Sequence, residues 1–140
     1  MKSFLSPLLR TGAKDHVLEN VRTGQVIADR LLTAFDSGSR RQGLLGRDSL
    51  PAGTALIIAP SNAVHTFFMR FAIDVAFVRR DGRVLKVRST VRPRRITASL
   101  RAFAVIELPA GSLALSKTRA GDSLICRPAP PGDHSLSTVT

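Results

Sequence analysis

Two carboxylates, Asp74 and Glu107, are the residues of this sequence whose chemistry suits general acid and base catalysis. Carboxyl groups that share a cleft can have pKa values that are driven apart, so that one donates a proton and the other accepts it. Hydrolysis of this kind needs the two carboxyl groups within about 5 to 9.5 Å of each other. A hydrolase that uses Asp74 and Glu107 is therefore one alternative, although the sequence alone assigns no catalytic residue.

Other catalytic and metal-binding arrangements find little support. The single cysteine, Cys126, excludes a disulfide framework, a cysteine-based zinc finger and an iron–sulfur centre. Its neighbours in the sequence are apolar, and a thiol in such surroundings is usually inert. The histidines His16, His65 and His134 are far apart and lack the spacing of metal ligands. We therefore expect no metal ion and no cofactor.

Positive charge is concentrated in one part of the chain. The 140 residues include 21 Lys and Arg against 10 Asp and Glu, which gives a formal net charge of +11. Between Arg70 and Arg101 ten cations stand against two aspartates, so eight of the eleven net charges lie there. Weak nucleic-acid binding through residues 79–101 is a second alternative. We favour a solvated strand face instead, because no Tyr, Trp or exposed Phe supplies a stacking platform.

The elements that must position these residues are mostly strands. Short apolar or alternating runs, separated by Gly, Pro, Asp and Ser, recur through most of the chain. This pattern is typical of a small β-barrel or a sandwich. We expect a flexible N-terminus over residues 1–15, a single β-rich domain over 16–127 and a flexible Pro-rich tail over 128–140.

One short helix is predicted near residues 37–46. Asp36 or Ser37 can cap its first turn, and Gly46 can end it. Gly43 inside the segment lowers helix propensity, which argues against a longer helix. The sequence also allows a second helical turn at residues 111–115.

The hairpin around Asp81-Gly82 can be predicted in register. A two-residue loop would place cations opposite Phe77 and Val75. A three-residue loop over residues 80–82, with Gly82 in the left-handed position of a β-bulge, avoids this mixture. We predict the three-residue loop, with Phe77 opposite Leu85 and Val75 opposite Val87.

Residues 65–77 alternate between an apolar and a mixed face. The odd-numbered face, which includes His65, Met69 and the phenylalanines at 67, 71 and 77, is predicted to lie in the core. At the start of this face we expect His65 to be a structural histidine. Arg70 and Asp74 lie on the other face, where four strand residues span about 13 Å. These two side chains can meet only if the chain turns between them.

No targeting or membrane segment is recognisable. The apolar run in residues 1–10 is interrupted by Pro7, and no small-residue cleavage pattern follows it. The longest uncharged stretch, residues 49–69, contains prolines, a glycine, an asparagine and a histidine, which is unlike a membrane span. We therefore expect a cytoplasmic protein without a membrane span.

Several segments resemble one prokaryotic family of uncharacterised proteins, domain of unknown function 192. They are HTFFMRFAID at 65–74, FVRRDGRVLKV at 77–87, VIELPAG at 105–111 and AGDSL at 120–124. RRQGLLGRDSLPAG at 40–53 is similar to the family motif Arg-x-x-Gly-Leu-Met-x-Arg, with Leu45 in place of Met. The resemblance covers about residues 25–127, in order and with compatible spacing.

The resemblance implies a compact, mainly β domain with one short helix and no established activity. It places the family's polar positions on Arg40, Arg47, His65, Arg70, Asp74, Glu107 and Asp122. In one interpretation Arg40, Arg70, Asp74 and Glu107 form ion pairs that fasten the helix and the strand ends. In the other, Arg40, Arg47, His65, Arg70, Asp74 and Glu107 line a site for a small anionic or polar ligand or for a protein partner. This second interpretation requires the side chains to converge.

Overall fold

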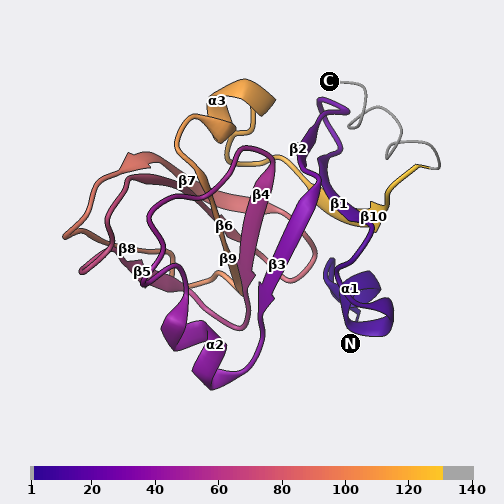
Figure 1. Ribbon diagram of the computed structural model, residues 1–140. Helices are drawn as coiled ribbons and strands as arrows, with labels where there is room; N and C mark the ends of the chain where they lie inside the picture. The colour runs from indigo at the N-terminus through magenta and orange to yellow at the C-terminus, as the bar shows by residue number, and fades with distance from the viewer. Residues whose placement is uncertain (1, 131–140) are drawn as a thin grey trace, which may run out of the picture.

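The computed structural model describes residues 2–130 and shows a mainly β fold around one five-stranded sheet (Figure 1). The strand order of this sheet is β3-β4-β9-β6-β7, and it is accompanied by a three-stranded sheet, β10-β1-β2, and a two-stranded sheet, β5-β8. The strands are β1 (His16–Asn20), β2 (Val26–Ala28), β3 (Arg30–Ala34), β4 (Thr54–Ile58), β5 (Ala63–His65), β6 (Ile73–Val78), β7 (Val84–Val91), β8 (Ile96–Ala98), β9 (Ala104–Pro109) and β10 (Leu124–Pro128). The helices are α1 (Ser6–Thr11), α2 (Ser37–Gln42) and α3 (Ser112–Ser116). None of these helices is long and apolar enough to cross a membrane.

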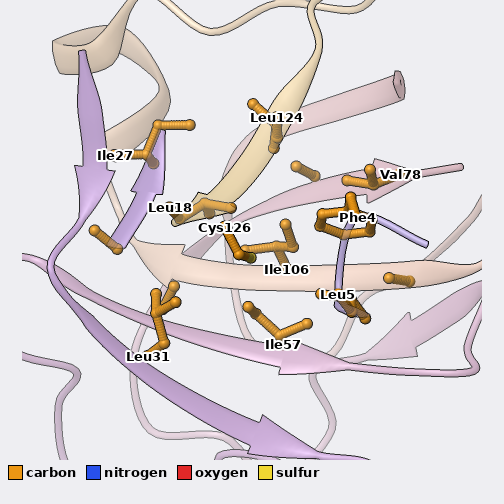
Figure 2. Packing of buried hydrophobic residues seen from close by; sticks show 14 of the residues in the cluster. Phe4, Leu5, Leu18, Ile27, Leu31, Ile57, Val78, Ile106, Leu124 and Cys126 are labelled. Carbon is orange, nitrogen blue, oxygen red and sulfur yellow. The ribbon is translucent and has the colours of Figure 1, made fainter. Parts of the chain in front are cut away.

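Apolar side chains cover the five-stranded sheet on both faces. Because side chains alternate along a strand, Ala76 and Val78 of β6 belong to one apolar cluster and Val75 and Phe77 to the other. The first cluster also includes side chains of the three-stranded sheet. Figure 2 shows this packing for Leu18, Ile57, Ile106, Leu124 and Cys126. The arrangement is sandwich-like, and within residues 2–130 the sheets do not close into the barrel that we had kept as an alternative.

Residues before β1 take part in the core. Phe4, Leu5 and Leu8 are buried in the first apolar cluster, and Phe4 and Leu5 are visible there in Figure 2. The backbone N–H of Phe4 donates to the carbonyl of Arg80 at 2.9 Å. The sequence led us to expect a flexible segment over residues 1–15 and did not reveal these contacts. Most of the expected tail over 128–140 lies outside the described residues.

The helix α2 begins where the sequence predicts. The Asp36 carboxylate accepts a hydrogen bond from the backbone N–H of Ser39 at 2.7 Å, and the Ser39 hydroxyl accepts one from the Asp36 N–H at 3.4 Å. This reciprocal cap satisfies two backbone donors at the start of the helix. The helix ends before Gly43, which has a φ of +50°, rather than at Gly46. It connects two parallel strands, β3 and β4, and so carries Arg40 to one end of the sheet.

The β6–β7 hairpin has the predicted loop but a different register. The N–H of Arg79 donates to the carbonyl of Arg83 at 2.8 Å, so residues 80–82 form the three-residue loop. Between the Val78–Val84 pair and the next pair, a bulge shifts the register by one residue. The predicted pairs of Phe77 with Leu85 and of Val75 with Val87 are therefore wrong: Phe77 pairs with Lys86, and Val75 with Arg88. The Lys86 ammonium group accommodates this pairing, because it lies over the Phe77 ring at 5.7 Å from its centroid.

Residues 66–72 do not continue the strand that the alternation predicts. The strand β5 ends at His65, and turns and bends follow until β6 begins at Ile73. Phe68 takes a left-handed conformation with a φ of +68°. As a result His65 and Phe67 are exposed, which corrects the prediction that they lie on a core face, whereas Met69 is buried as predicted.

Candidate functional site

A cavity beside α2 contains three of the six predicted site residues. Its volume is about 320 Å³, and Arg40, His65 and Glu107 line it. The rest of its lining is mostly apolar and comes from the end of α2, the β4 and β5 strands, and the segments that flank them. These residues are Arg41, Gln42, Gly43, Leu44, Leu45, Ile58, Ser61, Ala63, Val64, Met69 and Ile96.

Glu107 is the most buried polar residue that lines this cavity. It lies in β9, where its register partners are Leu56 of β4 and Val75 of β6. The residue is 2% exposed, and its Oε2 atom has no hydrogen-bond partner among the described residues. Burial raises the pKa of Glu107 to about 7, because it disfavours the charged form. A buried acceptor without a partner is costly, so a ligand that donates a hydrogen bond to Oε2 would stabilise this site.

Arg40 and His65 occupy less buried parts of the cavity lining. The Nη1 atom of Arg40 donates to the carbonyl of Phe35 at 2.9 Å, which fixes the half-buried guanidinium group near the helix. His65, at the end of β5, is exposed, and its ring centroid lies 6.0 Å from that of Phe67. Arg41 is also exposed and adds a second cation. The cavity therefore combines outer positive charge with an inner carboxyl group.

Asp74 lies on the opposite face of the sheet from Glu107. In the register of β6 and β9, Asp74 pairs with Leu108, and Val75 pairs with Glu107. Paired residues share a face, whereas adjacent residues in one strand point to opposite faces. The two carboxyl groups are therefore separated by the sheet itself. This geometry does not support the hydrolase alternative, which needs both groups in one cleft.

The carboxylate of Asp74 accepts hydrogen bonds from three backbone N–H groups around it. Its Oδ1 atom accepts a hydrogen bond from the N–H of Thr90 at 2.8 Å. Its Oδ2 atom accepts bonds from the N–H groups of Gly111 at 3.1 Å and Leu113 at 2.9 Å. Asp74 is 0% exposed. Its role in this structure is to hold the start of α3 and the end of β7 against β6.

The remaining two predicted site residues do not line the cavity. Arg70 pairs with Asp48 at 2.6 Å on the surface, where the two side chains are 63% and 82% exposed. Arg47 is exposed as well. Across residues 2–130, no ion pair joins Arg40, Arg70, Asp74 and Glu107 to one another. The ion-pair interpretation of these four residues is therefore wrong.

Asp122 forms a separate structural junction. Its carboxylate accepts hydrogen bonds from Nε of Arg22 at 2.6 Å, from Nδ2 of Asn20 at 2.9 Å and from the N–H of Arg119 at 2.9 Å. The hydrogen bond from the Arg22 guanidinium group is the main reason why the pKa of Asp122 is well below its usual range. These contacts fasten the β1–β2 hairpin to the turn before β10.

The apolar part of the cavity was not predicted from the sequence. Met69 was interpreted as core packing, and Ile58 and Leu44 were not singled out as site residues. Leu44 follows Gly43 within the segment that resembles the family motif, which is the one signal in the sequence that pointed to this region. Ile58 and Met69 could not be assigned to a cavity without knowledge of how β4 and the 66–72 segment pack together.

The fold and the cavity define a class of protein: a sandwich-like β domain in which a cavity beside the crossover helix contains an inner carboxyl group. The chain belongs to the DUF192 family, whose model, described as "Uncharacterized ACR, COG1430", matches residues 19–126. This match confirms the resemblance found in the sequence. No curated protein matches the chain.

Two solved structures are similar to this chain in fold. One is a protein from Sinorhizobium meliloti 1021 described as a "putative transcription regulator", with a TM-score of 0.68 and 21% sequence identity over 78% of this chain and 89% of that one. The other is a protein of unknown function from Novosphingobium aromaticivorans DSM 12444, with a TM-score of 0.67 and 20% identity over 78% of this chain and 81% of that one. At these identities the similarity shows the fold alone.

Proposed function

We propose that this protein binds a small polar molecule in the cavity lined by Arg40, His65 and Glu107. The observation that carries the proposal is the Glu107 carboxyl group, which is buried in the lining and whose Oε2 atom lacks a partner within residues 2–130. Buried polar atoms in folded proteins nearly always have a partner, and an unpaired one in a cavity is a point where a ligand can bind. The volume of about 320 Å³ suits a small molecule better than a protein segment.

The lining indicates the chemistry of the ligand. An amine or hydroxyl group would donate a hydrogen bond to the carboxyl group of Glu107. Ile58 and Met69 would contact a short apolar body. A carboxylate or phosphate group would be attracted to the guanidinium groups of Arg40 and Arg41 at the less buried part of the cavity. Small amino acids, amino alcohols and their phosphate esters carry this combination of groups.

Binding rather than hydrolysis is the function that these contacts support. Asp74 is committed to three backbone N–H groups on the other face of the sheet, so it supplies no second carboxyl group to the cavity. Glu107 alone, with its pKa near 7, is suited to accept or to share a proton with a bound donor.

The proposal can be tested by following the backbone amide signals of the isotope-labelled protein during titration with ω-amino acids, amino alcohols and phosphoethanolamine. Signals of residues around the cavity, such as Gly43, Val64 and Glu107, should shift with a saturable dependence on concentration. The E107Q variant keeps the shape of the side chain but loses one acceptor, so it should bind at least about tenfold more weakly.

The control is R70A, which removes an exposed side chain that was a candidate site residue in the sequence but lies outside the cavity. It should bind as tightly as the unmodified protein. If every probe leaves the cavity signals unchanged, or if E107Q and R70A weaken binding equally, the proposed function is wrong.

A further inference from the structure

A second exposed surface adjoins the cavity and shares Ile96 with its lining. The segments that carry this surface flank β5 and β8, away from α1 (Figure 1). The turn after β7 and the segment after β5 meet there. We call it the Phe68 surface and define it by Phe67, Phe68, Arg92, Arg94, Arg95 and Ile96. Phe68 is 85% exposed, Ile96 71% and Phe67 39%, and the three arginines are exposed as well. The expectation that no exposed Phe could serve as a stacking platform is therefore wrong.

A buried side chain holds the two segments of the Phe68 surface together. Thr66, which is 0% exposed, donates from its hydroxyl group to the carbonyl of Arg92 at 2.6 Å and accepts from the N–H of Arg95 at 2.9 Å. The backbone of Thr66 also donates to the carbonyl of Arg95 at 2.8 Å and accepts from the N–H of Arg94 at 3.1 Å. These hydrogen bonds hold the segment that carries the exposed rings against the turn that carries the three arginines.

Both segments of this surface contain a non-glycine residue in a left-handed conformation. The φ angle is +68° at Phe68 and +67° at Arg94. Such a conformation is uncommon for residues other than Gly, Asn and Asp, and it persists where surrounding contacts enforce it. The left-handed backbone at Phe68 thus coincides with a ring that is 85% exposed and belongs to neither apolar cluster.

A basic hollow adjoins the same turn. Its volume is about 260 Å³, and it is lined by Arg88, Arg92 and Arg95 with the hydroxyl-bearing residues Ser89, Thr90 and Thr97. Within residues 2–130 no ion pair joins Arg88, Arg92 or Arg95 to a carboxylate. Asp74, which accepts a hydrogen bond from the backbone N–H of Thr90, is itself 0% exposed. Guanidinium groups match the geometry of phosphate oxygens, and hydroxyl groups can donate further hydrogen bonds to them.

From these observations we propose that the Phe68 surface and the adjoining hollow bind single-stranded nucleic acid. The hollow would hold backbone phosphates, and the rings of Phe68 and Phe67 would stack on unpaired bases. A duplex offers its bases for stacking only at its ends, so the exposed rings favour a single strand. A lipid bilayer with anionic headgroups is the competing occupant, and the vesicle experiment below distinguishes it from a single strand.

The test is fluorescence anisotropy with a labelled oligothymidylate of about 15 nucleotides and a duplex of the same length, each at several salt concentrations. The protein should bind the single strand more tightly than the duplex, and affinity should fall as salt rises. F68A should weaken single-strand binding about five-fold to a hundred-fold, with the same salt dependence as the unmodified protein. R92A and R95A should each reduce the slope of log affinity against log salt by about 0.7.

Two control variants match these changes in chemistry but lie elsewhere. L100A removes a side chain that is 84% exposed and is not part of the Phe68 surface, and R10A removes a cation at the end of α1. Neither should alter affinity or salt dependence. The proposal is overturned if no oligonucleotide binds at low salt, or if F68A binds as tightly as the unmodified protein. It is also overturned if phosphatidylserine-containing vesicles bind in a Phe68-dependent manner while the oligonucleotide does not, since the surface would then serve a membrane.

Discussion

Asp74 and Glu107 lie one register position apart on the adjacent strands β6 and β9, and their side chains project from opposite faces of the sheet. Both are almost fully buried, at 0% and 2% exposure. Asp74 accepts three backbone hydrogen bonds, whereas Oε2 of Glu107 accepts none within the described chain. The carboxyl group of Asp74 therefore stabilises the fold on one face of the sheet, whereas that of Glu107 has an unpaired oxygen atom on the other face, where the cavity lies.

E107Q should remove a pH dependence from the stability of the protein. The pKa of Glu107 is raised from 4.5 to about 7 in the folded state, so between these values the unfolded chain has released a proton that the folded chain retains. The free energy of unfolding therefore falls as pH rises through this range, by about 3 kcal/mol for this group. Urea denaturation at about pH 5 and about pH 8 measures the loss.

The amide of the E107Q variant does not titrate, so its stability should fall less over the same range. The control is E19Q, which changes a carboxylate that is paired with Arg127 at 2.8 Å away from the cavity. E19Q should retain the pH dependence of the unmodified protein. Equal losses in E107Q and in the unmodified protein would show that Glu107 is ionised in the folded state at neutral pH.

D74A should destabilise the protein strongly. The substitution leaves the N–H groups of Thr90, Gly111 and Leu113 without their acceptor, and each buried unpaired donor costs about 1 to 3 kcal/mol. We expect a decrease of at least about 3 kcal/mol in the free energy of unfolding, measured by urea denaturation. D48A removes the exposed partner of Arg70 and should cost less than about 1 kcal/mol. Similar effects of the two variants would contradict the role assigned to Asp74.

The parts of the fold that depend on local sequence were predictable. Of the two cap candidates, Asp36 and Ser37, the structure uses Asp36, and a cap depends on a few adjacent residues. The three-residue loop at 80–82 is present, but the reason for predicting it was wrong, because the bulge restores the pairs of Phe77 with Lys86 and of Val75 with Arg88 that the loop was chosen to avoid. The bulge that shifts Phe77 to Lys86 was not predictable in the same way. It depends on how β7, an edge strand with a mixture of apolar and charged residues, packs over the core.

The candidate site was predictable only in part, for a related reason. The alternation along residues 65–77 suggested one continuous strand. Instead, Thr66 forms hydrogen bonds with the backbone of Arg92 and Arg95, and the chain turns between β5 and β6. Those contacts join segments that are far apart in the sequence, so the alternation of apolar and polar residues does not reveal them. The separation of Asp74 from Glu107 likewise follows from the register of β6 with β9, in which a shift of one residue would reverse the face.

G82A should be more destabilising than an ordinary loop substitution. Gly82 has a φ of +97°, and a Cβ atom there would clash with the carbonyl oxygen of Leu124. The carbonyl of Gly82 also accepts a hydrogen bond from the N–H of Leu124 at 2.8 Å, so the hairpin cannot move away without losing this contact with β10. We expect a loss of at least about 2 kcal/mol in the free energy of unfolding, by thermal or urea denaturation. G24A, at a glycine with a φ of +69° and open space around it, is the control and should cost less.

Cys126 should be unreactive in the folded protein. It is 5% exposed in the first apolar cluster, and burial raises the pKa of its thiol to about 12, so almost none of the reactive thiolate is present near neutral pH. A thiol reagent such as Ellman's reagent should modify it only after the chain is unfolded in denaturant. An L100C variant, which adds a thiol at a position that is 84% exposed in the unmodified protein, should react promptly with one equivalent while Cys126 stays protected. Rapid reaction of both thiols without denaturant would mean that β10 opens readily, since this strand carries Cys126 against the central sheet.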